Sequence, residues 1–173
     1  MCGINGIIAK QGLINLEQYY KAHKLLDHRG PDDEGFLIQH NGLFFSCSGN
    51  KGPHGVKQRY PHLLNQKTAS IVLGHHRLSI VDLSEDGHQP VSCANQRFWM
   101  VYNGEVYNYV ELRNELINKG WRFRSKTDSE VVLCSFAEWG VESFNRFNGM
   151  WALAIYDTLE EKLYLSRDRF GIK

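Results

Sequence analysis

The sequence has few cysteines, and no two of them are close together. They are Cys2, Cys47, Cys93 and Cys134. This scatter fits neither the disulfide framework of a small secreted domain nor the ligand spacing of a zinc ribbon. The adjacent histidines at 75 and 76 do not suggest a metal site either, because neighbours on a strand point to opposite faces. We therefore expect reduced thiols, no metal and a cytoplasmic protein.

Long apolar runs and an excess of one charge are also missing. The longest apolar run, "MWALAIY" at 150–156, is far shorter than the ~20 residues that span a bilayer. No basic segment followed by an apolar stretch and a cleavage site opens the chain. The net charge of +1 gives no electrostatic footprint for nucleic acid, so neither a membrane nor a nucleic-acid partner is expected. The 173 residues suit one domain, 1–173.

Hydrophobic periodicity predicts strands at both ends of the chain and helices between them. Asn41-Gly42 separates two apolar runs and predicts a tight hairpin, whereas 48–68 has no sustained period and is expected to form a surface excursion. This order favours a layered α+β domain over regular βαβ winding. Strands are expected within 2–9, 35–40, 42–47, 69–83, 97–108, 150–157 and 162–168, and helices within 17–30, 108–120, 127–140 and 141–149.

Capping residues mark two of these helices. Asn108 is expected to be the N-cap of the helix within 108–120. Thr127 and Glu130 have the spacing of a capping box, which would leave the side chain of Asp128 free for a ligand. The alternative for Asp128 is a favourable interaction with the positive end of the helix dipole.

Cys2 directly follows the initiator methionine. Removal of Met1 would give Cys2 a free α-amine, whose reference pKa of about 7.7–8.0 suits a base at neutral pH better than that of lysine, at about 10.4. One residue could then supply both nucleophile and base. The alternative is a small buried apolar residue at the start of a strand.

Several motifs together resemble the N-terminal glutaminase domain of glutamine-dependent asparagine synthetases. The resemblance runs from Cys2 to Lys173 and implies a class II glutamine amidotransferase of the N-terminal nucleophile hydrolase superfamily. That fold is a four-layer αββα sandwich, with two antiparallel sheets between helical layers. The motifs are "MCGI", "RGPDDEG" at 29–35, "LGHHRLSIVDL" at 73–83, "GHQP" at 87–90, "YNGEVYNY" at 102–109, "KTDSE" at 126–130 and "SRDRFGIK" at 166–173.

The resemblance implies a catalytic role for three residues. Cys2 would attack the side-chain amide of glutamine and form a thioester, while its own amine moves the proton. The Asn103 side-chain amide and the Gly104 backbone N–H would stabilise the oxyanion. From the residues alone, Asn103-Gly104 also fits a tight hairpin turn.

The resemblance also implies how glutamine is held. Arg77 would bind the α-carboxylate through two parallel hydrogen bonds, although a lone arginine at a strand end is more often a surface charge. Glu105 and Asp128 would receive the α-ammonium. We expect the segment "RGPDDEG" to have a structural rather than a chemical role. Gly30-Pro31 would form a turn, and Arg29 and Asp32 would be available for a charged pair near the pocket. Backbone groups of Leu78, Ser79, Ile80 and Val81 would line the same pocket.

The family continues past "RDRFGIK" into an ATP-using synthetase domain, and no Gly-rich "SGG" phosphate loop appears in this sequence. The expected partners are therefore L-glutamine and a C-terminal synthetase domain to which ATP and magnesium would belong; no cofactor is expected in the glutaminase domain. A homo-oligomer stays open, as does the ammonia acceptor, which could be aspartate, another acid or a sugar. The alternative function is a catalytically silent regulatory or assembly module of a larger synthetase.

Overall fold

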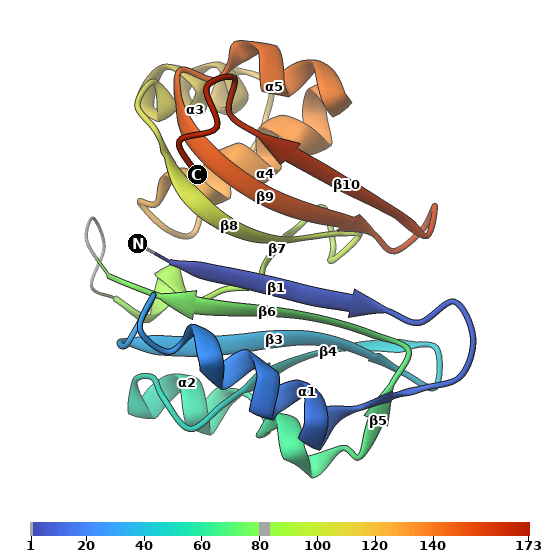
Figure 1. The fold of residues 1–173 in the computed structure, drawn as a ribbon. Helices are drawn as coiled ribbons and strands as arrows, with labels where there is room; N and C mark the ends of the chain where they lie inside the picture. Colours follow the sequence, from blue (N-terminus) through green and yellow to red (C-terminus); the bar gives the residue numbers. More distant parts are fainter. Residues whose placement is uncertain (1, 80–83) are drawn as a thin grey trace. The chain divides into compact units, whose positions relative to one another are not determined.

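The computed structural model describes residues 2–79 and 84–173, and the chain divides into two compact units. The first unit comprises residues 1–80 and 88–90, and the second comprises 81–87 and 91–173. Each unit contains a four-stranded antiparallel sheet with helices packed against it (Figure 1). The expected α+β class, with two antiparallel sheets and helices, is confirmed. Among the described residues, no helix is long and apolar enough to cross a membrane.

The sheet of the first unit has the strand order β1-β6-β3-β4. Helix α1 packs on one face of it, where Leu16, Tyr19 and Tyr20 meet the buried side chains of the sheet. A short pair, β2 and β5, lies beside the main sheet. The elements are β1 (Gly3–Ile8), β2 (Ile14–Asn15), α1 (Leu16–His23), the 3-10 helix η1 (Lys24–Leu26), β3 (Asp33–His40), β4 (Leu43–Ser48), α2 (His54–Arg59), η2 (Leu63–Asn65), β5 (Thr68–Ala69) and β6 (Ile71–Arg77).

The hairpin predicted at Asn41-Gly42 is confirmed. His40 of β3 pairs with Leu43 of β4, so the loop has two residues. Asn41 has φ 50° and Gly42 has φ 76°. Two consecutive positive φ values are those of the type I′ turn, whose twist matches that of the flanking strands.

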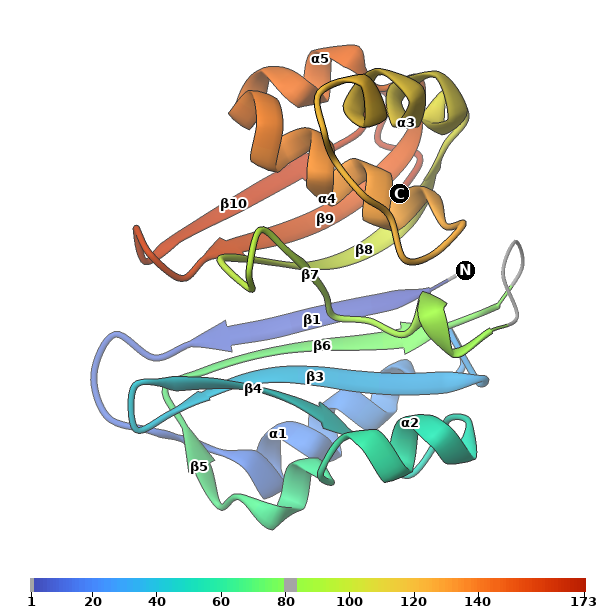
Figure 2. The ribbon, with the colours of Figure 1, turned by 180° about the vertical axis from the view of Figure 1, so that it is seen from behind.

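The prediction for 48–68 was only partly right. The segment follows β4 and folds back on it, since the Ser48 N–H donates to the Pro61 carbonyl at 2.9 Å (Figure 2). It contains α2 and η2, and the side chains of Val56 and Leu63 are buried. A six-residue helix and a 3-10 turn are too short to show a period in the sequence.

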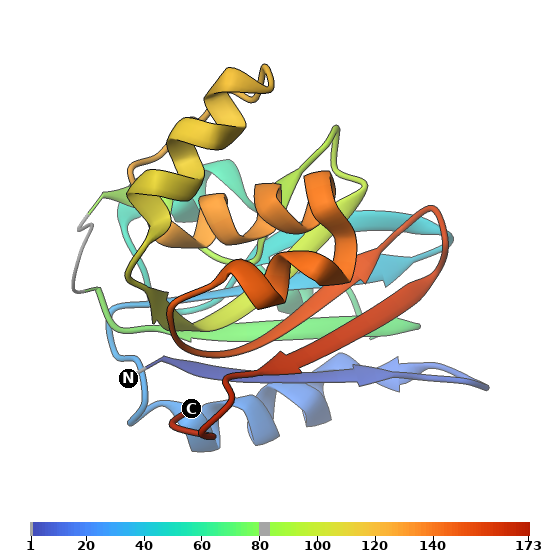
Figure 3. The same ribbon diagram turned by 90° about the horizontal axis from the view of Figure 1, so that it is seen from above.

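The sheet of the second unit has the order β10-β9-β8-β7. Its main helices pack on one face, seen from above in Figure 3, where α4 contributes Val132 and Phe136 to a core with Met100 and Ile155. The elements are the 3-10 helix η3 (Glu85–Gly87), β7 (Val91–Cys93), β8 (Phe98–Val106), α3 (Tyr109–Asn118), α4 (Asp128–Trp139), η4 (Gly140–Glu142), α5 (Ser143–Arg146), β9 (Gly149–Asp157) and β10 (Lys162–Arg167).

The prediction that Asn108 is the N-cap of α3 was right about its position but wrong about its side-chain hydrogen bond. Asn108 precedes the helix but makes no side-chain capping bond. Its amide instead donates to the Arg146 carbonyl at 3.0 Å and accepts the Asn148 N–H at 2.9 Å. The side chain therefore ties the start of α3 to the segment before β9.

Candidate active site

Cys2 lies at the beginning of β1, immediately outside the strand pair with β6. Gly3 pairs with His76, so Cys2 lies beside the end of β6. The Leu78 N–H donates to the Cys2 sulfur, with N and Sγ 3.4 Å apart, and the thiol lies 3.8 Å from the Leu78 carbonyl oxygen. The sulfur therefore has a backbone donor and a backbone acceptor on one residue, Leu78. The thiol is half-buried and free, as expected for a reduced protein.

The "RGPDDEG" segment holds the strand end that contacts Cys2. Gly30 lies so close to β6 that a Cβ at this position would be 2.5 Å from the His76 carbonyl carbon. The Asp32 N–H donates to the Arg77 carbonyl at 3.1 Å, and the Asp32 carboxylate accepts the Ser79 N–H at 2.8 Å. Asp32 therefore organises backbone next to Cys2, which fits the structural role expected for this segment, but through backbone contacts that the sequence did not indicate.

Arg77 is the last residue of β6 and is only 6% exposed. The alternative of a solvated surface charge is therefore wrong. Leu78 and Ser79 follow it and are half-buried. The structure thus brings Cys2, Arg77, Leu78 and Ser79 together at one end of the first unit's sheet. The predicted pocket residues Ile80 and Val81 lie outside the described residues.

In the second unit, Asn103 and Gly104 lie within β8 and do not form a turn. Asn103 pairs with Ala152 and Gly104 with Trp151 of β9. The hairpin alternative is therefore wrong. A Cβ on Gly104 would lie 2.6 Å from the Met150 carbonyl oxygen, so close backbone packing requires glycine here.

Gly104 presents its N–H on the edge of β8 that faces away from β9. In an antiparallel pair, the N–H groups of alternate residues point toward and away from the partner strand. The Val106 N–H points away from β9, because it donates to the Asp128 carboxylate at 3.0 Å. Gly104 is two residues away, so its N–H has the same direction. β7 pairs only with residues 98–100 of β8, within the described chain.

The prediction that a capping box leaves Asp128 free was wrong. The Thr127 hydroxyl does accept the Glu130 N–H, as an N-cap should. The Glu130 carboxylate, however, accepts the backbone N–H groups of Arg124 and Ser125 instead of returning to Thr127. Asp128 accepts the Tyr102 hydroxyl at 2.8 Å in addition to the Val106 N–H, and both bonds end on Oδ2.

Asp128 and Glu105 form a region of negative charge beside β8. Burial raises the pKa of Asp128, and the negative charge of Glu105 raises it further, against the lowering effect of the Val106 N–H and the Tyr102 hydroxyl. Glu105 itself is exposed. A cation bound near both groups would relieve their repulsion and favour the ionised form of Asp128.

Comparison with known proteins identifies the family of this chain. Residues 59–173 match the model of the glutamine amidotransferase domain. The chain belongs to the glutamine amidotransferase family. The matched region includes the strand end at Arg77, the "YNGEV" segment of β8 and Asp128.

Relatives match this chain over its entire length. A protein of Methanocaldococcus jannaschii is 36% identical to it, and the asparagine synthetases [glutamine-hydrolyzing] 1 and 3 of Bacillus subtilis are 32% and 33% identical. In each comparison 100% of the chain is covered. The chain spans only 31%, 23% and 24% of the length of these three relatives. The resemblance to asparagine synthetases is thereby confirmed for the glutaminase part.

A solved structure shares the fold of this chain. It is the glutamine phosphoribosylpyrophosphate amidotransferase of Bacillus subtilis, in complex with ADP and GMP. The TM-score is 0.73 at 21% identity, with 98% of this chain and 38% of that chain covered.

Proposed function

We propose that the chain hydrolyses the side-chain amide of L-glutamine to glutamate and ammonia, with Cys2 as the nucleophile once Met1 is removed. The observation that carries this proposal is the Leu78 N–H beside the Cys2 sulfur at the start of β1, in a chain of the glutamine amidotransferase family. A nucleophilic cysteine needs a nearby base to accept its proton. The α-amine of Cys2 would be that base.

The proposed reaction has two steps. The Cys2 sulfur attacks the amide carbon, and the thiol proton passes through the α-amine to the leaving nitrogen, so that ammonia departs and a thioester remains. Water then adds to the thioester, releases glutamate and restores the thiol. The oxyanion of each tetrahedral intermediate would accept hydrogen bonds from the Asn103 side chain and the Gly104 N–H.

The two ends of the amino acid would be bound by charge. Arg77 would pair with the α-carboxylate, because a planar guanidinium offers two parallel N–H donors. Glu105 and Asp128 would receive the α-ammonium, because its positive charge would offset the repulsion between the two carboxylates. The backbone of Leu78 and Ser79, and of Ile80 and Val81 beyond them, would line the pocket.

In the whole protein, the ammonia would pass to an acceptor activated by a synthetase domain that uses ATP and magnesium. The support is the length and the names of the relatives, two of which are glutamine-hydrolysing asparagine synthetases. We propose aspartate as the acceptor and the cytoplasm as the location; the alternatives are another acid or a sugar. The αββα stacking of layers stays a prediction from the resemblance.

The test combines an intact-mass measurement with an assay for glutamate release from L-glutamine. A chain that lacks Met1 is expected to release glutamate, and a chain that keeps Met1 is expected to be inactive because its α-amine is locked in a peptide bond. L-asparagine and a primary amide without charged ends are the matched control substrates. A processed chain that releases no glutamate would contradict the proposal and favour a catalytically silent module.

Asp128→Asn is expected to raise the KM for glutamine about tenfold or more, because the loss of one charge-assisted contact of about 1.5–3 kcal/mol weakens binding of the ammonium. The asparagine oxygen can still accept from Tyr102 and Val106, so the fold should persist. In the wild type, KM should rise as pH falls through the raised pKa of Asp128, since protonation removes the charge. This rise begins at a higher pH than the rise caused by an ordinary carboxylate, and the Asp128→Asn variant should lack this early part of the rise. An unchanged KM and an unchanged pH profile would remove Asp128 from the proposed site.

A further inference from the structure

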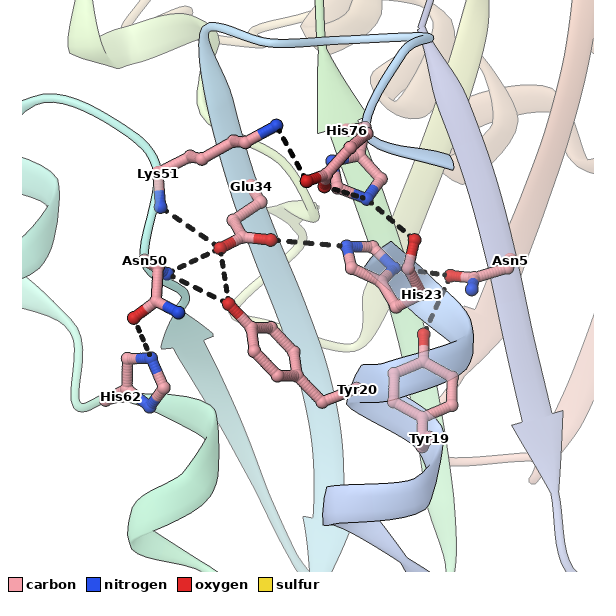
Figure 4. Close-up of polar contacts among 10 residues, drawn as sticks. Asn5, Tyr19, Tyr20, His23, Glu34, Asn50, Lys51, His62 and His76 are labelled. Carbon is pink, nitrogen blue, oxygen red and sulfur yellow. Dashed lines mark hydrogen bonds and ion pairs between the residues drawn. The ribbon is translucent and has the colours of Figure 1, made fainter. Parts of the chain in front are cut away.

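A buried cluster of polar side chains lies in the first unit, between α1 and the sheet (Figure 4). His23 ends α1, Glu34 lies on β3 and His76 on β6, and all three are at most 1% exposed. One potential ligand atom from each of the three lies within 4.8 Å of the other two. These residues are far apart in the sequence, so the cluster becomes visible only in the folded chain.

The hydrogen bonds of His23 define which of its ring nitrogens has a lone pair. Its Nδ1 lies 2.9 Å from the Asn5 side-chain oxygen, which also accepts the Tyr19 hydroxyl at 2.8 Å. Because that oxygen can only accept, Nδ1 bears the hydrogen and Nε2 of the neutral ring bears the lone pair. This Nε2 faces the Glu34 carboxylate, 3.7 Å from Oε2. Two acceptors therefore face each other in the protein interior.

Among the described residues, no side chain donates a hydrogen bond to His23 Nε2 or to Glu34 Oε2. Glu34 Oε1 accepts the Tyr20 hydroxyl and the Asn50 and Lys51 N–H groups, so its donors all lie on one side. His23 Nε2 and Glu34 Oε2 are buried and have no hydrogen-bond partner within the described chain. Asp27 Oδ1 is also buried without a hydrogen-bond partner among the described residues, and it lies 3.6 Å from His76 Nε2. The other carboxylate oxygen of Asp27, Oδ2, pairs with the Lys51 ammonium at 3.1 Å. Unpaired buried acceptors are costly, so a cluster of them indicates a missing positive group.

His76 adds a second imidazole lone pair. Its Nε2 lies 3.0 Å from the His23 carbonyl oxygen and therefore bears the hydrogen, which leaves the lone pair on Nδ1. This Nδ1 is also buried without a hydrogen-bond partner among the described residues.

We propose that His23, Glu34 and His76, with Asp27 beside them, bind one divalent transition-metal ion of the zinc class. Imidazole nitrogens together with a carboxylate oxygen are ligands that Zn²⁺ accepts. Ligand atoms on a tetrahedral zinc are roughly 3.3 Å apart, close to the observed 3.7 Å between His23 and Glu34. The ion would join α1 to β3 and β6.

Binding includes a rotation of one imidazole ring. The rings of His23 and His76 are stacked, with centroids 3.9 Å apart and planes 15° apart. An ion lies in the plane of each imidazole that binds it, so two stacked rings cannot share one without turning. The aromatic proton resonances of both histidines are therefore expected to shift on loading.

The test is a titration of the chelator-treated chain with Zn²⁺, and with Co²⁺ as a spectroscopic probe. We expect one ion per chain by elemental analysis, a higher thermal midpoint, and Co²⁺ absorption bands without thiolate charge transfer. Glu34→Gln is expected to fold, because its amide oxygen accepts the same three donors while its NH₂ donates to His23 Nε2. Its affinity for the ion should fall by more than the ~10–100-fold that loss of an outer partner costs.

His54→Gln is the matched control, because His54 is exposed and lies outside the cluster. It should bind the ion as the wild type does, as should Cys2→Ala, which excludes binding through the terminal thiol. A wild type that binds less than one ion per chain would overturn the proposal. So would a folded Glu34→Gln chain with unchanged affinity.

Discussion

Replacing Cys2 with alanine is expected to reduce glutamate release from glutamine by about 10³-fold or more, because the covalent route disappears with the nucleophile. Initial rates of glutamate formation at saturating glutamine measure this loss. The fold should be unaffected, since Cys2 lies outside the paired part of β1 and, within the described residues, its thiol hydrogen-bonds with Leu78. Circular dichroism and the thermal midpoint check that point.

Cys47→Ala is the matched control for this variant. Burial raises the pKa of Cys47 to about 11, so very little thiolate is present there at neutral pH. Its removal should leave kcat unchanged, even if it lowers stability by opening a small cavity. Equal loss of activity in both variants would mean that the assay reports on folding, and an active Cys2→Ala chain would eliminate Cys2 as the nucleophile.

Asn103→Ala is expected to lower kcat by about 10²–10³-fold with little change in KM, the pattern for loss of a single oxyanion donor. The reason is that the donor interacts more strongly with the oxyanion than with the neutral carbonyl of bound glutamine. Steady-state kinetics over a range of glutamine concentrations separates the two parameters.

Asn118→Ala provides the comparison, because Asn118 is exposed at the end of α3 and has no proposed role. It should match the wild type in both kcat and KM. If Asn103→Ala instead raises KM and leaves kcat intact, Asn103 binds the ground state of the substrate, and the oxyanion role belongs elsewhere.

The two Asn-Gly pairs explain why part of the fold could be predicted and part could not. Asn41-Gly42 forms a turn because its flanking strands pair with each other, which the local sequence indicates. Asn103-Gly104 has the same local preference, but β8 pairs with β9, whose residues 149–157 lie more than 40 positions further along the chain. Extended pairing over nine residues outweighs the turn preference of two.

The candidate site has the same limitation. The position after Met1 indicated Cys2, and the resemblance to the family indicated Arg77 and Asp128; the structure buries Arg77 and gives Cys2 and Asp128 hydrogen-bond partners. The partners of Asp128 were not predictable, because Tyr102 and Val106 approach it through tertiary packing. The contact of Asp32 with the Ser79 N–H was missed for the same reason, since it joins positions 47 residues apart.

The backbone amide of Leu78, which donates to the sulfur of Cys2, gives the protein an internal reporter. The Leu78 N–H belongs to no strand pair and its hydrogen bond ends on the sulfur, so the strength of that bond depends on the charge of the sulfur. Thiol, thiolate, thioester and alkylated sulfur accept this hydrogen bond to different degrees. Hydrogen exchange and the amide chemical shift at one residue therefore follow the chemical state of the terminal cysteine without any label on the cysteine itself.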